Sequence, residues 1–344
     1  MIELTGIRIK AIACNVPDTI VDNLQVESYE AEKLEKIVAA TGVRYRHKAP
    51  ETECASDYSV AAAKRILKDQ DIDVNDIGIV VFVSQSSDYI LPATSCIIQD
   101  RLGLPADTIA FDVNLGCSGY VYGLCIVGSL LKISKKRYAL LLAGDTNAGH
   151  VSSNDQSALF IFGDAGTATL LEKVDNDAMM MFSIETDGSK ADSLIIKAGG
   201  ARNPIKPDSL IPRLWPDGNT RADNQIYMDG MEIFSFAIST VVQHVKDLIE
   251  NTEIYHGFVF HQANYFMLET MRKQIKIPKD KFLYSIQNYG NTSSASIPIT
   301  ICHNNANLEM NDRYLLCGFG VGLSWASADV TFDRCRILSI EKGV

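Results

Sequence analysis

A cysteine at a predicted strand-to-helix turn is the strongest candidate for chemistry in this sequence. Cys117 is flanked by Gly116 and Gly119, with a β-rich run at residues 109–113 before it and an apolar, helix-like run at residues 121–133 after it. The unpaired N–H groups and the dipole of a helix start favour a thiolate, so the position predicts a lowered thiol pKa and a nucleophilic sulfur. The flanking glycines would let a substrate carbonyl approach the backbone. The alternative is a buried structural cysteine.

Two neutral polar residues follow other predicted strand ends. His261 lies between a predicted strand and a predicted helix, a position that lowers the pKa of an imidazole and keeps it neutral. Asn291 offers an amide donor at another helix start. Taken alone, each residue more often has a structural role, as a core histidine or as a turn or cap residue. Together with Cys117 they predict acyl thioester chemistry, in which the sulfur takes an acyl group and the two donors stabilise negative charge on a second thioester carbonyl.

The spacing of the polar turns indicates an internal duplication. The intervals between successive strand ends are 33 and 27 residues in the first half and 30 and 27 in the second, counted between Ser84, Cys117 and Gly144 and between His261, Asn291 and Gly318. One strand–helix unit used twice would give Cys117 and Asn291 equivalent helix starts. Strand-end residues of both halves would then face one shared pocket.

Strands and helices alternate along the chain, which predicts an α/β fold with helices on the faces of a sheet. Apolar and β-branched runs predict strands at residues 7–12, 79–83, 109–113, 138–142, 167–171, 179–184, 257–260, 282–286, 314–316 and 324–332. Helical spacing predicts helices at residues 23–38, 55–67, 92–102, 121–133, 231–249 and 265–275, and one more after residue 294.

Residues 187–224 form a long irregular segment. The segment holds four of the ten prolines, Pro204, Pro207, Pro212 and Pro216, and has little periodicity. Within a compact enzyme such a segment is typical of a lid or binding loop; the alternative is a surface insertion without a role.

The composition and net charge exclude several classes of protein function. The 344 residues are 47% hydrophobic, enough for a large core in one big domain or two halves. A net charge of −10 argues against nonspecific nucleic-acid binding. No apolar run reaches the roughly 18 residues of a membrane span. The first residues lack the basic start and apolar stretch of a signal peptide, so a cytoplasmic location is expected.

The eight cysteines show no metal-binding pattern. None forms a Cys-x-x-Cys pair and no histidine cluster accompanies them, so neither a metal site nor a disulfide framework is expected. Free thiols also fit a reducing compartment.

Seven motifs, in order along nearly the whole chain, resemble those of the thiolase-fold condensing enzymes, and most closely those of the β-ketoacyl-acyl-carrier-protein synthase III family. Any one of them alone is weak, but the set is specific for the superfamily. They are Thr41-Gly42-Val43-Arg44, Asp88-Tyr89 with Pro92, Asn114-Leu115-Gly116-Cys117-Ser118-Gly119, Phe162-Gly163-Asp164, His261-Gln262-Ala263-Asn264, Tyr289-Gly290-Asn291-Thr292-Ser293-Ser294 and Gly318-Phe319-Gly320-Val321-Gly322.

The resemblance implies a thiolase-like, five-layered αβαβα fold of two similar halves, residues 1–174 and 175–344, and an obligate homodimer. It implies that Cys117 is acylated and that His261 and Asn291 decarboxylate a malonyl thioester and hold the enolate. The backbone N–H groups of Cys117 and Gly320 would form the oxyanion hole. Leu91 would reach the acyl pocket of the partner subunit, or else only pack in the interface.

The implied substrates are thioesters, and no further cofactor is expected. An acyl primer on coenzyme A or on an acyl carrier protein would condense with malonyl carrier protein. Relatives that accept acetyl-coenzyme A often sandwich adenine between a Trp and an Arg, and Lys36 and Ala40 stand at those positions here. An aromatic stacking face is therefore missing, so the donor is either an acyl-coenzyme A held differently or an acyl carrier protein.

A carrier protein is acidic, so its docking site should be basic. The candidate patch follows the His261 helix and comprises Arg272, Lys273 and Lys276, with Lys279 and Lys281 beyond them. A second basic run, Lys132, Lys135, Lys136 and Arg137, is interpreted as a solvated helix end.

Related activities remain as alternatives. Elongating synthases have a second His where this chain has Asn291, and thiolases have a second catalytic Cys, whereas Cys317 is interpreted here as a core residue. Val321 replaces a proline of type III polyketide synthases, which weighs mildly against that class. A thiolase-fold transferase that passes the acyl group to an oxygen, nitrogen or sulfur acceptor, a type III polyketide synthase-like condensation and a non-catalytic partner subunit stay open, as do the primer and the pathway.

Overall fold

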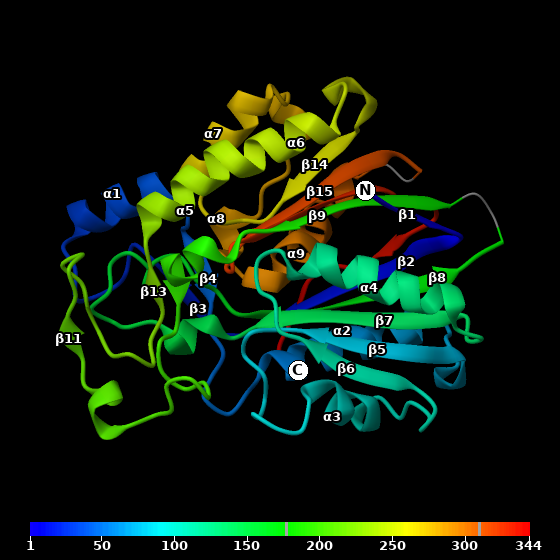
Figure 1. Cartoon of the computed structure of the whole chain (residues 1–344), viewed down its shortest axis with the longest axis horizontal. Coiled ribbons are helices and arrows are strands. Elements are labelled where there is room, and N and C mark those ends of the chain that lie inside the picture. Colours follow the sequence, from blue (N-terminus) through cyan, green and yellow to red (C-terminus); the bar gives the residue numbers. More distant parts are fainter. Residues whose placement is uncertain (176–177, 309–310) are drawn as a thin grey trace.

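The computed structural model describes residues 1–175, 178–308 and 311–344, and its strands form two large sheets separated by helices (Figure 1). Together the two sheets and their covering helices stack as α, β, α, β, α, so the expected five-layered α/β architecture is confirmed. No helix in these three ranges is both long and apolar enough to cross a lipid bilayer.

The first sheet has the order β17-β2-β8-β7-β5-β6, and β18 also pairs with β2. Strands β5 and β7 are fully buried and run parallel to each other, and β5 also runs parallel to β6. Buried parallel strands are expected where helices cover both faces of a sheet. The bounds are β2 Ile7–Val16, β5 Ile77–Val83, β6 Ile109–Val113, β7 Tyr138–Asp145, β8 Ala165–Lys173, β17 Arg336–Ile337 and β18 Glu341–Lys342.

The second sheet has the order β1-β9-β16-β15-β14. The two sheets exchange their terminal strands: β1 joins the sheet built mainly from the second half, and β17 and β18 join that of the first half. The division of the chain into units at residues 174 and 175 stays a prediction. The bounds are β1 Ile2–Thr5, β9 Met179–Thr186, β14 Gly257–Phe260, β15 Arg313–Gly320 and β16 Ser324–Thr331.

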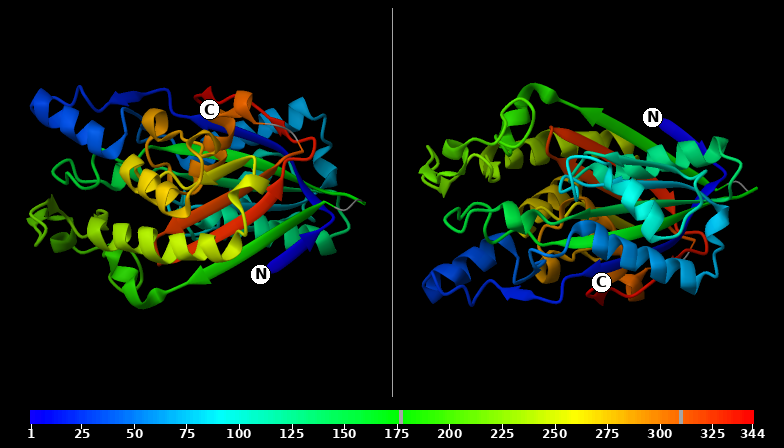
Figure 2. Two further views of the ribbon diagram at one scale, coloured as in Figure 1. Left: turned by 90° about the horizontal axis from the view of Figure 1, so that it is seen from above. Right: turned by 90° about the horizontal axis from the view of Figure 1, so that it is seen from below.

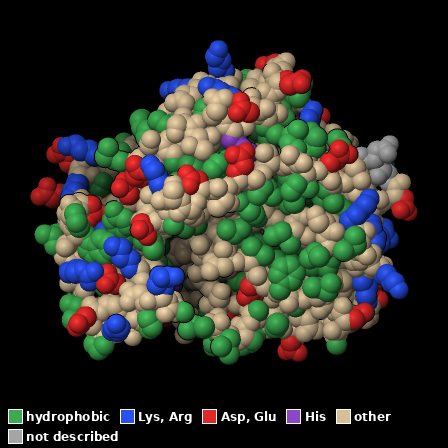
Figure 3. All heavy atoms as spheres, in the orientation of Figure 1, with side chains coloured by type: hydrophobic (Ala, Val, Ile, Leu, Met, Phe, Trp, Pro, Cys, Tyr) green, Lys and Arg blue, Asp and Glu red, His purple; other side chains and the backbone are tan. Residues whose placement is uncertain are grey.

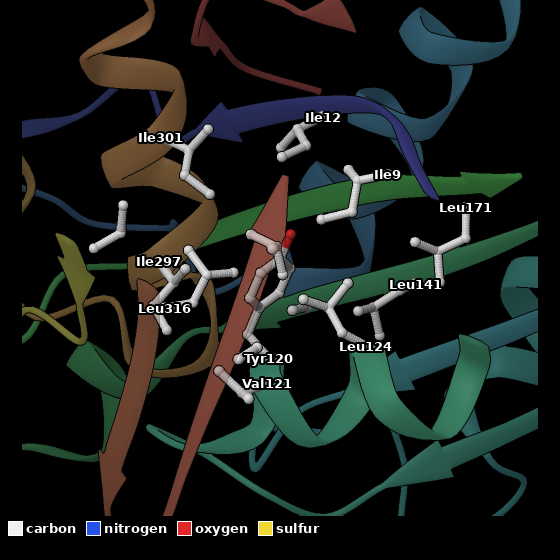
Figure 4. Packing of buried hydrophobic residues seen from close by; sticks show 14 of the residues in the cluster. Ile9, Ile12, Tyr120, Val121, Leu124, Leu141, Leu171, Ile297, Ile301 and Leu316 are labelled. Carbon is white, nitrogen blue, oxygen red and sulfur yellow. The ribbon is translucent and has the colours of Figure 1, made fainter. Parts of the chain in front are cut away.

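Helices α4 (Gly119–Ile133) and α9 (Ser296–His303) form the layer between the sheets. Buried side chains of both helices and of both sheets make one hydrophobic cluster, in which Tyr120, Leu124, Ile297 and Leu316 lie together (Figure 4). The apolar character of both helices follows from this placement, because a helix between two sheets has no face left for solvent.

Further helices form the two outer layers (Figure 2). Helices α2 (Ala55–Asp69) and α3 (Thr94–Arg101) cover the first sheet. The second sheet is covered by α7 (Tyr265–Ile275) and by a continuous helix of α5 (Gly230–Phe236), a π-helical turn (Ala237–Val241) and α6 (Val242–Leu248). The predicted helices at residues 231–249 and 265–275 are confirmed.

The irregular segment at residues 187–224 contains only single-turn helices and two-residue strands, as its proline content predicts. Its strands pair as β10 (Leu194–Ile195) with β13 (Tyr227–Met228) and as β11 (Arg213–Leu214) with β12 (Thr220–Arg221). Trp215 stacks on Tyr227 with 5.1 Å between ring centroids, and the buried Arg221 guanidinium bonds Asp155 at 2.7 Å. These contacts anchor the segment to Asp155 and Tyr227, which lie before and after it in the sequence.

Two predicted elements are wrong. The helix expected at residues 23–38 begins only at α1 (Ala31–Thr41). The side chain of Asn23 is instead buried and donates to the carbonyls of Val43 and Phe160, at 3.1 and 2.9 Å. Before α1 the chain adds the short strand β3 (Ile20–Asp22), paired with β4 (Tyr45–His47).

The strand expected at residues 282–286 is absent. Only Phe282 bridges to β14, through Phe258, and the short helix α8 (Ile286–Tyr289) follows. The buried side chain of Gln262 takes the place of a neighbouring strand, because its Oε1 accepts the N–H groups of Ser285 and Ile286 at 3.0 and 3.2 Å.

We expect Gly163→Ala to lower the free energy of unfolding by at least about 2 kcal/mol, because the added methyl group would collide with the carbonyl oxygen of Tyr289. Both partners are backbone, so neither a rotamer change nor a small shift relieves the collision. Gly188→Ala is the matched control, since no atom lies within 4 Å of its added Cβ. Urea denaturation curves of the two variants would contradict the expectation if their midpoints coincide.

Candidate functional site

Cys117 lies between β6 and α4 and lines a cavity of about 610 Å³. The lining includes apolar side chains from residues 194–226 and uncharged polar side chains that follow β5, β6 and β7. They include Leu194, Ile195, Ile226, Gln85, Asn114 and Asn147. On the face shown in Figure 3, a hollow separates the irregular segment from the layered body.

The turn at residues 291–294 brings the three candidate residues together, and Ser293 is its centre. The Ser293 backbone N–H donates to Asn291 Oδ1 at 2.9 Å. Its side chain hydrogen-bonds to the Cys117 sulfur, and its backbone hydrogen-bonds to the His261 ring. Ser293 adopts the left-handed backbone conformation (φ 52°), which is uncommon for a non-glycine residue and lets all three contacts form.

Asn291 is buried and fixed by its backbone as well as by its side chain. Its N–H donates to the Ile161 carbonyl at 2.9 Å, and its carbonyl accepts from Gly163 N–H at 3.0 Å. Because Oδ1 is occupied by the Ser293 N–H, the NH₂ end of the carboxamide is the end left to act as a donor.

His261 is buried, with Nδ1 2.7 Å from Ser296 Oγ and its ring edge-on to Phe319. Burial lowers the pKa of His261 to about 3, partly offset by the backbone hydrogen bond to Ser293. The prediction of a neutral imidazole is therefore confirmed. The expected cause is wrong, because α7 begins four residues later, at Tyr265, and burial is the larger influence.

The prediction of a lowered Cys117 pKa is also wrong. Burial, reinforced by the Asp145 carboxylate, raises the pKa of Cys117 to about 12. Hydrogen bonds from the Val321 backbone, the Cys117 backbone and the Ser293 side chain act in the opposite direction but do not prevail. The resting sulfur is thus a neutral thiol beside a neutral imidazole.

Gly320 lies directly against the thiol. A Cβ added to Gly320 would lie 2.7 Å from Cys117 Cβ and 2.9 Å from its Sγ, so only glycine fits there. The Gly320 backbone therefore lies close to the Cys117 sulfur, and its role as an oxyanion-hole donor stays a prediction.

The remaining predicted residues lie away from Cys117. Leu91 is 79% exposed and does not line this cavity, whereas its neighbours Tyr89 and Ile90 do. Cys317 is fully buried among the residues under α7, which confirms it as a core residue. Lys36 is exposed on α1 and pairs with Glu32 at 2.7 Å.

The predicted docking patch divides into paired and unpaired cations. Arg272 makes two hydrogen bonds to Glu269, at 2.9 and 3.0 Å, and one to the Ile277 carbonyl, at 2.8 Å. Lys273 and Lys276 are exposed, and neither pairs with any side chain in the described part of the chain.

The sequence reasoning missed the parts played by Ser293 and Asp145. The Asp145 carboxylate is fully buried and accepts from Gln85 N at 2.7 Å, Ser294 N at 3.1 Å and Ser294 Oγ at 2.7 Å. It joins the ends of β5 and β7 to the turn that carries Asn291. The only signal for either residue was a position at a polar strand end or turn, which many residues share.

The described residues include no group of three or more His, Cys, Asp or Glu side chains arranged to hold a metal ion. All eight cysteines are free thiols.

Comparisons with known proteins place this geometry in a family. A family model for 3-oxoacyl-[acyl-carrier-protein (ACP)] synthase III matches residues 111–188, and a second model, for its C-terminal part, matches residues 249–332. The β-ketoacyl-[acyl-carrier-protein] synthase III of Clostridium perfringens is 32% identical over 319 residues, covering 91% of this chain and 95% of the relative. The corresponding protein of a Sulfurovum species is also 32% identical, covering 94% and 95%.

A solved structure has the same fold over nearly the whole chain. A 3-oxoacyl-(acyl-carrier protein) synthase from Burkholderia xenovorans superposes with a TM-score of 0.92 at 34% identity, covering 99% of this chain and 98% of that one. The chain therefore belongs to the β-ketoacyl-acyl-carrier-protein synthase III family.

Proposed function

We propose that this protein is an acyltransferase that condenses an acyl primer with a malonyl thioester on a carrier protein, releasing carbon dioxide. The observation that carries the proposal is the convergence of Cys117, His261 and Asn291 on Ser293 beside one cavity. The relatives are named β-ketoacyl-[acyl-carrier-protein] synthase III, which supports the same reaction class for this chain.

In the first step the Cys117 sulfur attacks the thioester carbonyl of the primer. A carbon–sulfur bond to Cys117 forms, the bond to the donor sulfur breaks, and the thiol proton leaves with the donor as its free thiol. The raised pKa of Cys117 makes this proton transfer part of the acylation step. The N–H groups of Cys117 and Gly320 would stabilise the tetrahedral oxyanion.

In the second step a malonyl thioester loses carbon dioxide. His261 and Asn291 would donate hydrogen bonds to the thioester oxygen as it gains negative charge, and the enolate carbon would attack the acyl group on Cys117. The bond between the acyl carbon and sulfur then breaks, and the leaving thiolate takes up a proton from water. Both donors are neutral in this step. With a pKa of about 3, the His261 imidazole carries no positive charge at neutral pH.

The donor, partner and compartment follow from the same proposal. The primer is an acyl-coenzyme A or an acyl carrier protein thioester, bound without the adenine sandwich because Lys36 and Ala40 offer neither an aromatic ring nor a guanidinium group for stacking. The free thiols of all eight cysteines fit a cytoplasmic location. No cofactor beyond the substrate thioesters takes part in these steps.

A homodimer would cover the exposed apolar residues beside the site. Strand β6 is an edge strand, and hydrophobic side chains gather over α4 on the face shown in Figure 3. Ile90 and Leu91, 96% and 79% exposed, would then face the partner, with Leu91 at the partner's acyl pocket.

Incubation with short acyl-coenzyme A thioesters is expected to add one acyl group to Cys117, seen as a mass shift in the intact protein. Cys117→Ala removes the attacking sulfur and should abolish both the adduct and condensation. Carbon dioxide release from a malonyl thioester separates condensation from acyl transfer to an oxygen, nitrogen or sulfur acceptor. An adduct that persists in Cys117→Ala would contradict the assignment.

We expect His261→Ala and Asn291→Ala each to lower decarboxylation by roughly 10²–10³-fold, since each removes one donor to the enolate. Acylation of Cys117 should fall by less than about tenfold, because neither side chain attacks or leaves in that step. Rapid-quench measurements of the two half-reactions distinguish the effects. Equal losses in both would mean that the residues hold Cys117 rather than the enolate.

The pH dependence of decarboxylation and of cysteine alkylation should reflect the neutral His261 imidazole and the neutral Cys117 thiol. With the pKa of His261 at about 3, decarboxylation by the acylated enzyme should stay flat from pH 5 to 8, because the imidazole stays unprotonated throughout. With the pKa of Cys117 at about 12, the rate of its alkylation by iodoacetamide should keep rising with pH to at least about 9. A decarboxylation inflection near pH 6.5 would contradict the burial of His261.

A further inference from the structure

Asn147 places an unpaired carboxamide in the cavity that contains Cys117. The residue is only 9% exposed, and it lines that cavity. Within the described part of the chain, the carboxamide makes no hydrogen bond, although both of its neighbours in sequence do. A buried polar group without a partner is unfavourable by about 1–3 kcal/mol. Water or a ligand in the cavity must therefore supply the partner.

The backbone on both sides of Asn147 is fixed. The N–H of Thr146 donates to Ser86 Oγ at 2.9 Å, and the N–H of Ala148 donates to Asp164 Oδ1 at 2.9 Å. Asp164 is itself buried. The chain thus holds the Asn147 backbone in place and leaves its side chain free for a ligand, which lowers the entropy lost on binding.

A second carboxamide, that of Gln85, lies against the turn that carries Cys117. A Cβ added to Gly116 would lie 2.3 Å from Gln85 Oε1, and the Gln85 N–H donates to Asp145 Oδ1 at 2.7 Å. The Gln85 side chain also lines the cavity and makes no hydrogen bond to any described residue. An acyl group on the sulfur would therefore enter a cavity with two carboxamides to satisfy.

The rest of the lining indicates which substituent the carboxamides would suit. Apolar side chains that can pack against methylene groups are those of Phe162, Leu194, Ile195 and Ile226. Among the described residues, the lining has no Asp, Glu, Lys or Arg. Desolvation by its neighbours lowers the pKa of His150, so that imidazole is uncharged at neutral pH. A charged substituent would be enclosed here without a counter-charge, which is strongly unfavourable.

We propose that the acyl primer is a short chain with a hydroxyl group and that the carboxamides of Asn147 and Gln85 bind this hydroxyl. The inference rests on the proposed function, because it takes the acyl group on Cys117 as the ligand of the cavity. A carboxamide both donates and accepts, so it can satisfy the lone pairs and the proton of a hydroxyl group. A plain alkyl chain would displace water from the carboxamides without replacing its hydrogen bonds.

The test compares four-carbon acyl groups that differ in their polar substituent: butyryl, 2-, 3- and 4-hydroxybutyryl, and succinyl. Each is offered as its pantetheine thioester, the portion that coenzyme A and a carrier protein share, and acylation of Cys117 is followed by intact mass. We expect at least one hydroxybutyryl isomer to acylate Cys117 at least tenfold faster than butyryl, because butyryl leaves the carboxamides unpaired. Succinyl should react more slowly than that isomer, because its carboxylate is charged.

Asn147→Leu replaces the carboxamide by an apolar side chain of similar shape. It should lower the ratio of the hydroxybutyryl to the butyryl rate constant at least tenfold, and Gln85→Leu should lower the same ratio. A general loss of folded protein slows both reactions alike and leaves the ratio unchanged. Asn154→Leu is the matched control, because Asn154 is exposed and does not line the cavity.

The inference is overturned if butyryl reacts as fast as every hydroxybutyryl isomer, if succinyl is preferred, or if Asn147→Leu leaves the ratio unchanged. Binding to Cys117→Ala, which cannot be acylated, keeps the inference separate from the proposed function. Calorimetry should give this variant a Kd at least tenfold lower for a hydroxybutyryl than for the butyryl thioester. If no thioester acylates the unsubstituted protein, the proposed function fails, and the calorimetry alone decides whether the cavity selects a hydroxyl group.

Discussion

A fully buried carboxylate holds together the two parts of the chain that meet at the site. Asp145, at the end of β7, accepts hydrogen bonds from the N–H and the hydroxyl of Ser294, one residue beyond Ser293. The same carboxylate fixes the Gln85 backbone at the end of β5. Without these partners the buried charge would be strongly destabilising, so the turn and the two strand ends must keep their relative positions. The contacts of Ser293 to Cys117, His261 and Asn291 depend on that constraint.

The site that results contains no free charge at its reacting groups. Burial keeps both the Cys117 thiol and the His261 imidazole neutral, through a raised pKa in one case and a lowered pKa in the other. Stabilisation of developing negative charge must then come from fixed dipoles: backbone N–H groups near Gly320, the Asn291 amide and the imidazole. Such dipoles are effective because the surrounding fold has already oriented them. The close packing of Gly320 on Cys117 and of Ser293 on all three residues serves that orientation.

Much of this arrangement could be predicted from the sequence, because apolar periodicity and polar strand ends follow directly from local geometry. Helix α7 and strand β14 end where their apolar patterns end. The failures involve long-range contacts. The apolar run after Phe282 cannot form a strand because Gln262 occupies its N–H groups, and Asn23 is buried against Val43 and Phe160 rather than in a helix. The Cys117 pKa was predicted from the helix start alone, whereas desolvation by both halves of the chain decides it.

The exchange of terminal strands between the sheets has a consequence for biosynthesis. Strand β1 needs β9 as its partner, and β2 needs β17 and β18, which are synthesised long after β2 itself. Neither sheet can be completed while the C-terminal segment is still inside the ribosomal exit tunnel. The first half must therefore wait, partly assembled and with an open sheet edge, until β17 and β18 have left the ribosome. A gene split at the midpoint would leave each product without an edge strand that only the other encodes.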